Sequence, residues 1–85
     1  MYEIATRNTK IKKEIEKHIS TIKSINEKLN RLKKNPRKEI GAHTLHGRLK
    51  GKWACWLGSN IRMIYEIDDY EKIIIIEAIG THKIY

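Results

Sequence analysis

The chain of 85 residues is long enough for one domain, residues 1–85, and too short for a second independent one. Its 18 lysines and arginines outnumber its 10 aspartates and glutamates, and the formal net charge of +8 favours an anionic partner: nucleic acid, an acidic protein or an anionic membrane surface. A single cysteine excludes an internal disulfide framework, so we expect a cytoplasmic protein. We expect neither a signal peptide nor a membrane span, because no apolar run approaches the ~20 residues that a span requires.

The first elements are a short strand and a helical region. Residues 2–5 predict the strand, and Asn8 or Thr9 is suited to cap the helix that follows. Apolar residues then recur at spacings of three and four, which predicts a helix with one apolar face. This apolar stripe consists of Ile11, Ile15, Ile19, Ile22, Ile25, Leu29 and Leu32.

A single helix over residues 9–34 would be about 39 Å long, although a compact domain of this size has a radius of gyration of only about 12 Å. We therefore expect the helix to break near residues 18–21. Ser20 or Thr21 could cap a second helix there, which gives an antiparallel helical hairpin.

The second half of the chain predicts a β-sheet. Pro36 ends the helical region, because the residue before a proline is disfavoured in helical geometry, and a loop or short edge strand follows up to Gly47. Alternating apolar residues then predict consecutive antiparallel hairpins. The expected strands cover residues 48–57, 61–67 and 72–79, with tight turns at residues 58–60 and 68–71.

Cations and one aromatic residue share a face of the predicted strands. If the helices cover the apolar face, the uncovered face displays Arg48, Lys50, Lys52, Trp56 and Arg62. Same-face residues recur every ~6.6 Å, so these cations could meet successive phosphates of a single-stranded nucleic acid while the tryptophan stacks on a base. The alternative is that the cations only keep an exposed sheet face soluble. The absence of acidic residues between residues 40 and 65 favours a binding groove.

Histidines lie on both sides of this strand region in the sequence. His43 and His46 precede it and His82 follows it. Imidazoles exchange protons near neutral pH, which suits attack by a ribose 2′-hydroxyl on its own phosphate while a cation holds the developing charge. Each could instead be an ordinary surface histidine. A metal site formed by these three histidines and Cys55 is weakly indicated, because H-x-x-H lacks a carboxylate and Cys55 should point to the core.

Four segments in this order resemble the RelE/ParE toxin superfamily of toxin–antitoxin systems, and its RelE and YafQ branch most closely. They are "NP" (35–36), "LHGRLKG" (45–51), "GSNIRMIYEIDD" (58–69) and "IGTHKIY" (79–85). The resemblance implies an α+β fold with β-α-α-β-β-β order, in which a helical hairpin packs on one face of an antiparallel sheet and the first strand lies beside the last. It also implies a type II toxin that cleaves mRNA, usually on the ribosome, without a cofactor, and that binds a cognate antitoxin.

The resemblance assigns roles to individual residues. His43 and His82 correspond to catalytic histidines, Arg62 to the arginine that binds the scissile phosphate, and Tyr85 to a C-terminal aromatic residue. Arg48, Lys50 and Lys52 correspond to a basic strand that contacts RNA.

Two departures from the family pattern leave other functions open. Trp56 stands where many members have an arginine or histidine, and Asn60 where some have an aspartate, so activity could be weak or use another acid–base pair. A ParE-like inhibitor of DNA gyrase and a noncatalytic RNA-binding or ribosome-binding module are the alternatives. The sequence leaves the oligomeric state and the codon preference open.

Overall fold

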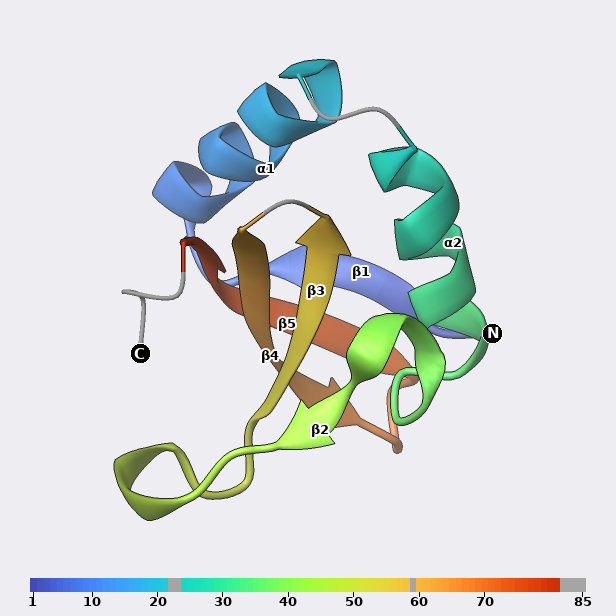
Figure 1. The fold of residues 1–85 in the computed structure, drawn as a ribbon. Helices are drawn as coiled ribbons and strands as arrows, with labels where there is room; N and C mark the ends of the chain where they lie inside the picture. The colour runs from blue at the N-terminus through green and yellow to red at the C-terminus, as the bar shows by residue number, and fades with distance from the viewer. Residues whose placement is uncertain (22–23, 59, 82–85) are drawn as a thin grey trace.

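In the computed structural model, two helices cover one face of a five-stranded sheet (Figure 1). The structure describes residues 1–21, 24–58 and 60–81, so the expected roles of Ile22, His82 and Tyr85 lie outside the described residues. The strands lie in the order β1-β5-β4-β3-β2. The elements are β1 (Glu3–Thr6), α1 (Thr9–Thr21), α2 (Ile25–Lys34), the short 3₁₀ turn η1 (Glu39–Gly41), β2 (His43–Thr44), the 3₁₀ turn η2 (Gly47–Leu49), β3 (Trp53–Gly58), β4 (Ile61–Asp68) and β5 (Ile73–Gly80).

The sheet confirms the expected order but is mixed, not wholly antiparallel. β2, β3, β4 and β5 form antiparallel neighbours, whereas β1 lies beside β5 and runs parallel to it, with Glu3 opposite Ile73. A tight turn forces neighbouring strands to be antiparallel, but β1 and β5 are joined through the rest of the chain. Their relative direction is therefore not set by a local connection.

The helical hairpin is confirmed, with α1 ending at Thr21, close to the expected break near residues 18–21, and α2 beginning at Ile25. Asn8 caps α1 as expected, since its side-chain oxygen accepts a hydrogen bond of 2.9 Å from the backbone N–H three residues later. The hydroxyls of Ser20 and Thr21 donate to the Lys17 carbonyl at 2.7 and 3.1 Å. Because both hydroxyls are used inside α1, neither caps α2.

The apolar stripe of the helices packs on one face of the sheet and forms the core. Cys55 belongs to this core as expected, and burial raises the pKa of its thiol to about 12, so the thiol stays protonated. The clustered core residues are Ile11, Ile15, Ile25, Leu29, Leu32, Cys55, Leu57, Met63, Tyr65, Ile74, Ile76 and Ile79. The described part of the chain contains no helix long and apolar enough to cross a membrane. The helices thus occupy one face of the sheet and leave the other, the bare face, for the polar side chains.

The strand expected over residues 48–57 is shorter, because β3 begins only at Trp53. Residues 45–52 form a loop that projects from the sheet between β2 and β3 (Figure 1) and is called the basic loop below. Its base is closed by a hydrogen bond of 3.0 Å from the Leu45 N–H to the Lys52 carbonyl. Gly47 and Gly51 have φ angles of 67° and 92°. These left-handed conformations, which glycine adopts without steric cost, interrupt the extended backbone.

Candidate active site on the bare face of the sheet

Arg62 lies on the bare face, as predicted from the alternation of β4. Met63 and Tyr65, which follow Arg62 on β4 at odd-numbered spacings, belong to the core, and side chains on a strand point alternately to opposite faces. Ala54 and Ile64, which pair across β3 and β4, are 0% and 3% exposed but do not belong to the helix-covered core. The bare face therefore has a buried apolar centre with polar side chains around it.

Arg62 stacks on the ring of Trp56. The two residues are paired across β3 and β4, and the guanidinium carbon lies 3.9 Å from the centroid of the ring. Such a cation–π contact contributes about 0.5–2 kcal/mol, depending on its exposure. Trp56 is 38% exposed, but the ring face that carries Arg62 is not available to a nucleic-acid base. Base stacking by this residue stays a prediction.

His43 is held by a backbone carbonyl. It lies on β2 opposite Ala54, and its ring nitrogen Nδ1 is 2.9 Å from the carbonyl oxygen of Gly41. A carbonyl only accepts hydrogen bonds, so in the neutral ring Nδ1 carries the proton. The other ring nitrogen, Nε2, is then unprotonated and can take up a proton.

His43 and Arg62 lie on the same face, on either side of β3. Cross-strand partners share a face, and the partners of these two residues, Ala54 and Trp56, are two positions apart on β3. Two strand spacings and one same-face repeat place their Cα atoms roughly 12 Å apart. Side chains of this length can converge on one phosphodiester across such a distance. The structure thus brings together His43, Trp56 and Arg62.

The two C-terminal candidates, His82 and Tyr85, lie outside the described residues. The described part of the chain leads toward Arg62, because Gly80 at the end of β5 is its partner in the sheet. His82 follows Gly80 by two positions in the sequence. Both catalytic assignments stay predictions.

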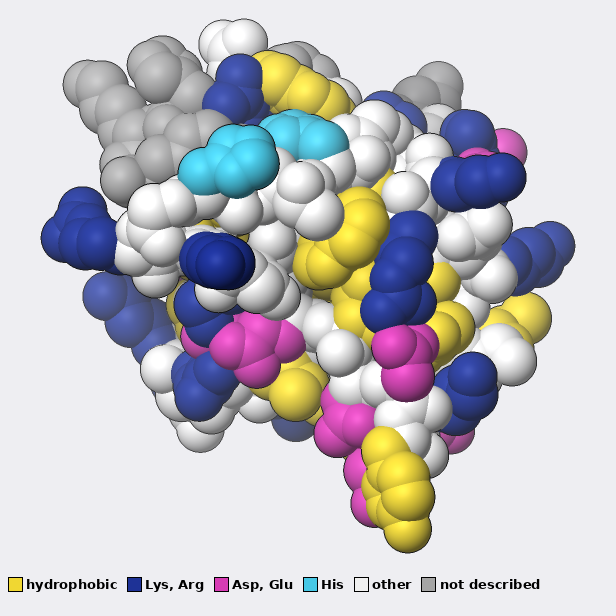
Figure 2. All heavy atoms as spheres, turned by 90° about the horizontal axis from the view of Figure 1, so that it is seen from below, with side chains coloured by type: hydrophobic (Ala, Val, Ile, Leu, Met, Phe, Trp, Pro, Cys, Tyr) yellow, Lys and Arg dark blue, Asp and Glu magenta, His cyan; other side chains and the backbone are white. Residues whose placement is uncertain are grey.

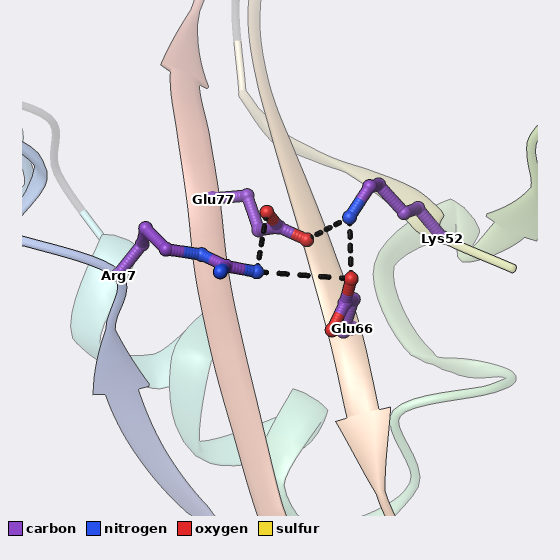
Figure 3. Close-up of polar contacts among 4 residues, drawn as sticks. All are labelled: Arg7, Lys52, Glu66 and Glu77. Atoms are coloured by element: carbon purple, nitrogen blue, oxygen red, sulfur yellow. Dashed lines mark hydrogen bonds and ion pairs between the residues drawn. The ribbon is translucent and has the colours of Figure 1, made fainter. Parts of the chain in front are cut away.

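Lys52 lies on the bare face but is paired with two carboxylates (Figure 3). Its ammonium group binds Glu66 and Glu77, and Arg7 binds the same two carboxylates, with Nη2 at 2.7 Å from Glu77 Oε1 and 3.7 Å from Glu66 Oε1. The hydrogen bond between Lys52 and Glu66 is the main cause that raises the pKa of the lysine and lowers the pKa of the glutamate. These four residues are called the ion-pair network below. It neutralises a cation that the sequence predicted to be open to RNA.

The two glutamates next to Lys52 were not predicted from the sequence. The alternation of β4 does place Glu66 on the bare face, beside Arg62 and Ile64. Glu77 carries no such signal, because the register between β4 and β5 shifts between Ile64 and Tyr65. This shift is visible only in the pairing of the two strands.

Arg48 and Lys50 are exposed in the basic loop and do not form a row on a strand. Within the described ranges, neither side chain makes an ion pair. Figure 2 shows histidine side chains beside lysine and arginine side chains on one face of the molecule, with acidic side chains next to them. The face shown in Figure 2 therefore carries both positive and negative side chains, although residues 40–65 include no acidic residue.

The alternative metal site cannot include both His43 and Cys55, and His82 lies outside the described residues. In residues 1–21, 24–58 and 60–81, no three histidine, cysteine, aspartate or glutamate side chains are grouped so that they could hold a metal ion. Cys55 points into the core, whereas His43 lies on the bare face. A sheet separates the two residues, so they cannot ligate one metal ion.

Solved structures of toxin–antitoxin proteins share this fold. The structure resembles the YoeB–YefM toxin–antitoxin complex from Staphylococcus aureus, with a TM-score of 0.73, 19% identity and coverage of 96% of this chain and 98% of the other. It also resembles YafQ from E. coli strain BL21(DE3), with a TM-score of 0.66, 21% identity and coverage of 99% and 97%. For the RelBE2 toxin–antitoxin complex from Mycobacterium tuberculosis, the TM-score is 0.71 at 16% identity, with coverage of 95% and 98%. The class is therefore that of RelE-like α+β toxin folds.

Family membership follows from the sequence profile. Residues 2–84 match the YafQ family, described as bacterial toxins of type II toxin–antitoxin systems, and the chain therefore belongs to this family. The match confirms the resemblance and the expected class of function, a type II toxin. A comparison with curated proteins gives no significant sequence match.

Proposed function

We propose that this toxin is an endoribonuclease that cleaves mRNA on the ribosome. The observation that carries the proposal is the position of His43 and Arg62 on one bare face, with the Nε2 atom of the histidine unprotonated in the neutral ring. This arrangement offers a proton acceptor and a cation to the same phosphodiester. It needs no cofactor.

In the proposed reaction, His43 Nε2 takes the proton of a ribose 2′-hydroxyl, and the oxygen attacks the adjacent phosphorus. The bond from phosphorus to the 5′-oxygen breaks, and His82 gives a proton to that leaving oxygen. The products are a 2′,3′-cyclic phosphate and a 5′-hydroxyl. Each proton-transfer group contributes typically 10²- to 10⁴-fold to the rate.

Arg62 stabilises the charge that develops on the phosphoryl oxygens. A guanidinium offers several N–H donors in one plane and matches the geometry of a phosphate. Stacking on Trp56 uses the flat face of the group and restricts the orientation of the guanidinium. The electrostatic contribution is large because the charge is held in place before the reaction begins.

The RNA follows the basic loop toward His43. Arg48 and Lys50 bind its phosphates, Lys52 contributes when it leaves the carboxylates of the ion-pair network, and Tyr85 or the exposed edge of Trp56 holds a base. A cognate antitoxin inhibits the toxin by covering this surface with an acidic or amphipathic segment. Relatives of the same fold have been solved together with antitoxins, which supports such a partner.

Expression in a bacterium tests the proposal. Growth should arrest with cut transcripts, and the cut ends should carry a 2′,3′-cyclic phosphate and a 5′-hydroxyl. Three single variants, His43→Gln, Arg62→Ala and His82→Ala, should each lower the cleavage rate of the purified protein by roughly 10²-fold or more. The matched control is His18→Gln on α1, which should cleave like the wild type.

The opposite result is arrested growth with intact transcripts. If the purified protein then also inhibits DNA supercoiling by gyrase, the ParE-like alternative would replace the proposed nuclease function. Salt-dependent RNA binding without cleavage and without a growth defect would favour the noncatalytic module.

A further inference from the structure

Trp56 is the common neighbour of the two catalytic candidates on the bare face. The guanidinium carbon of Arg62 lies 3.9 Å from the centroid of its ring. On the β2 side, Gly41 lies against the indole, since a Cβ atom added there would be 3.0 Å from Trp56 Cδ1. The carbonyl of the same glycine accepts the Nδ1–H of His43 at 2.9 Å. One side chain thus touches Arg62 directly and His43 through Gly41.

We propose that Trp56 is a positioning residue that directs the guanidinium of Arg62 and, through Gly41, selects the Nδ1–H tautomer of His43. The consequence for catalysis rests on the proposed nuclease function, whereas the positioning itself does not. The tryptophan thereby has a structural role in the site, through its contacts with Arg62 and Gly41. It organises the site without taking part in proton transfer.

The turn before His43 needs a neighbour that holds it in place. Ile40 has a φ of 46° and Gly41 a φ of 72°, so two consecutive residues adopt the left-handed conformation. A β-branched residue rarely adopts that conformation, because its Cβ approaches the backbone too closely. Ile40 packs against the core, and Gly41 packs against Trp56. The carbonyl that meets His43 is therefore oriented by these two contacts.

The tautomer determines which nitrogen can act as a base. An unrestrained neutral imidazole favours the proton on Nε2, which would leave Nδ1 as the acceptor. The Gly41 carbonyl reverses this preference, because a carbonyl can only accept a hydrogen bond. Without the packing of Trp56 on Gly41, we expect the carbonyl to move and the preference of the ring to revert.

The experiment is an NMR measurement on ¹⁵N-labelled full-length protein, with long-range proton–nitrogen correlations that identify the protonated nitrogen of His43. In the wild type, His43 should be mainly the Nδ1–H tautomer, and the side-chain protons of Arg62 should be shifted upfield by the ring current of Trp56. Trp56→Phe, which keeps an aromatic ring, should retain both signals. Trp56→Leu should lose the upfield shift and return His43 toward the Nε2–H tautomer.

A tryptophan on the same strand provides the control. Trp53 packs against the core, and Arg37 lies 5.8 Å from the centroid of its ring, so Trp53→Phe also removes an indole next to an arginine. It should leave the signals of His43 and Arg62 unchanged. For RNA cleavage, Trp56→Leu should lower kcat by roughly 10²-fold with a smaller change in KM, and Trp56→Phe should recover most of the loss.

Unchanged signals of His43 and Arg62 in Trp56→Leu would overturn the proposal. If this variant does not fold, the NMR spectrum of the wild type still tests the proposal. A dominant Nε2–H tautomer of His43 in the wild type would be incompatible with it. A wild type that shows both NMR signatures but leaves RNA intact would refute the nuclease function and support the positioning role. A wild type that cleaves RNA but shows neither NMR signature would support the nuclease function and refute the positioning role.

Discussion

Lys52 and Glu77 form an ion pair on the bare face of the sheet, although 25 positions separate them in the chain. Glu66 binds the same ammonium group, and Arg7 binds both carboxylates, so two cations and two anions form one neutral group (Figure 3). An RNA phosphate can bind Lys52 only in competition with these carboxylates. The network should therefore weaken RNA binding.

The double variant Glu66→Gln/Glu77→Gln should bind single-stranded RNA more tightly than the wild type. It releases Lys52 and Arg7, and each released cation that meets a phosphate should steepen the plot of log affinity against log salt by about 0.7. Fluorescence anisotropy with labelled RNA over a salt series measures both quantities.

Added net charge alone would also raise RNA affinity, so a control must match it. Glu16→Gln/Glu27→Gln changes the net charge equally but alters exposed residues of the helices. Its gain in affinity should be smaller. The network does not control access to Lys52 if both double variants gain the same RNA affinity. The same conclusion holds if Glu66→Gln/Glu77→Gln gains as much RNA affinity when Lys52 is also changed to methionine.

The pair Arg37–Asp69 should make stability depend on pH in the acid range. The guanidinium donates to both carboxylate oxygens at 3.1 and 2.7 Å, and the Tyr2 hydroxyl donates to one of them. Chiefly because of the Arg37 hydrogen bonds, the pKa of Asp69 falls from its ordinary value of 3.8 to about 2. A carboxyl with a lower pKa in the folded state stabilises the fold above the unfolded pKa, and this contribution is lost as pH falls through the folded pKa.

Urea denaturation at several pH values measures this effect. Between about pH 4 and pH 2, the wild type should lose more stability than Asp69→Asn, which should already be less stable at neutral pH. The control is Glu71→Gln, which removes an exposed carboxylate that makes no ion pair in the described part of the chain. Parallel acid curves of the wild type and Asp69→Asn would contradict the prediction.

A hydrogen bond from the Tyr65 hydroxyl connects β4 to the loop after α2. The hydroxyl is fully buried and donates a hydrogen bond of 2.6 Å to the carbonyl of Pro36. Tyr65→Phe leaves that buried carbonyl without this donor and should lower the free energy of unfolding by about 1–2 kcal/mol. Thermal or urea denaturation measures the loss, and Tyr70→Phe is the control, because this tyrosine is 93% exposed. A loss below about 0.5 kcal/mol in Tyr65→Phe would argue against the contribution of this bond.

Alanine substitutions at two glycines distinguish the cost of backbone strain from the cost of a clash with Trp56. Gly41 and Gly47 have similar φ angles of 72° and 67°, so alanine should cost about 1 kcal/mol of conformational energy at either position. Only Gly41→Ala adds a Cβ atom close to a neighbour, at 3.0 Å from Trp56 Cδ1, whereas nothing lies within 4 Å at Gly47. Gly41→Ala should therefore be the more destabilising change in urea denaturation. The difference between the stability losses of the two alanine variants should be smaller when Trp56 is also changed to leucine. If this difference is the same with Trp56 and with leucine at that position, the contact between Gly41 and Trp56 does not contribute.

Local patterns in the sequence determined which residues line each face. The spacing of three and four in the helices and the alternation in β3 and β4 place Cys55 in the core and Arg62 and Trp56 on the bare face. The side chain of Asn8 likewise caps α1 from a local signal. These features depend on the fixed periods of helices and strands, so they can be read from neighbouring residues alone.

Only the tertiary structure decided which charges meet on the bare face. Lys52 is paired with acids far away in the chain, and the register shift between Ile64 and Tyr65 that accompanies the placement of Glu77 has no local signature. The same holds for the parallel direction of β1 and for the glycine turns that remove Arg48 from the sheet. The physical reason is that strand register and ion pairing depend on groups brought together by folding, whereas periodicity only records the face on which each side chain lies.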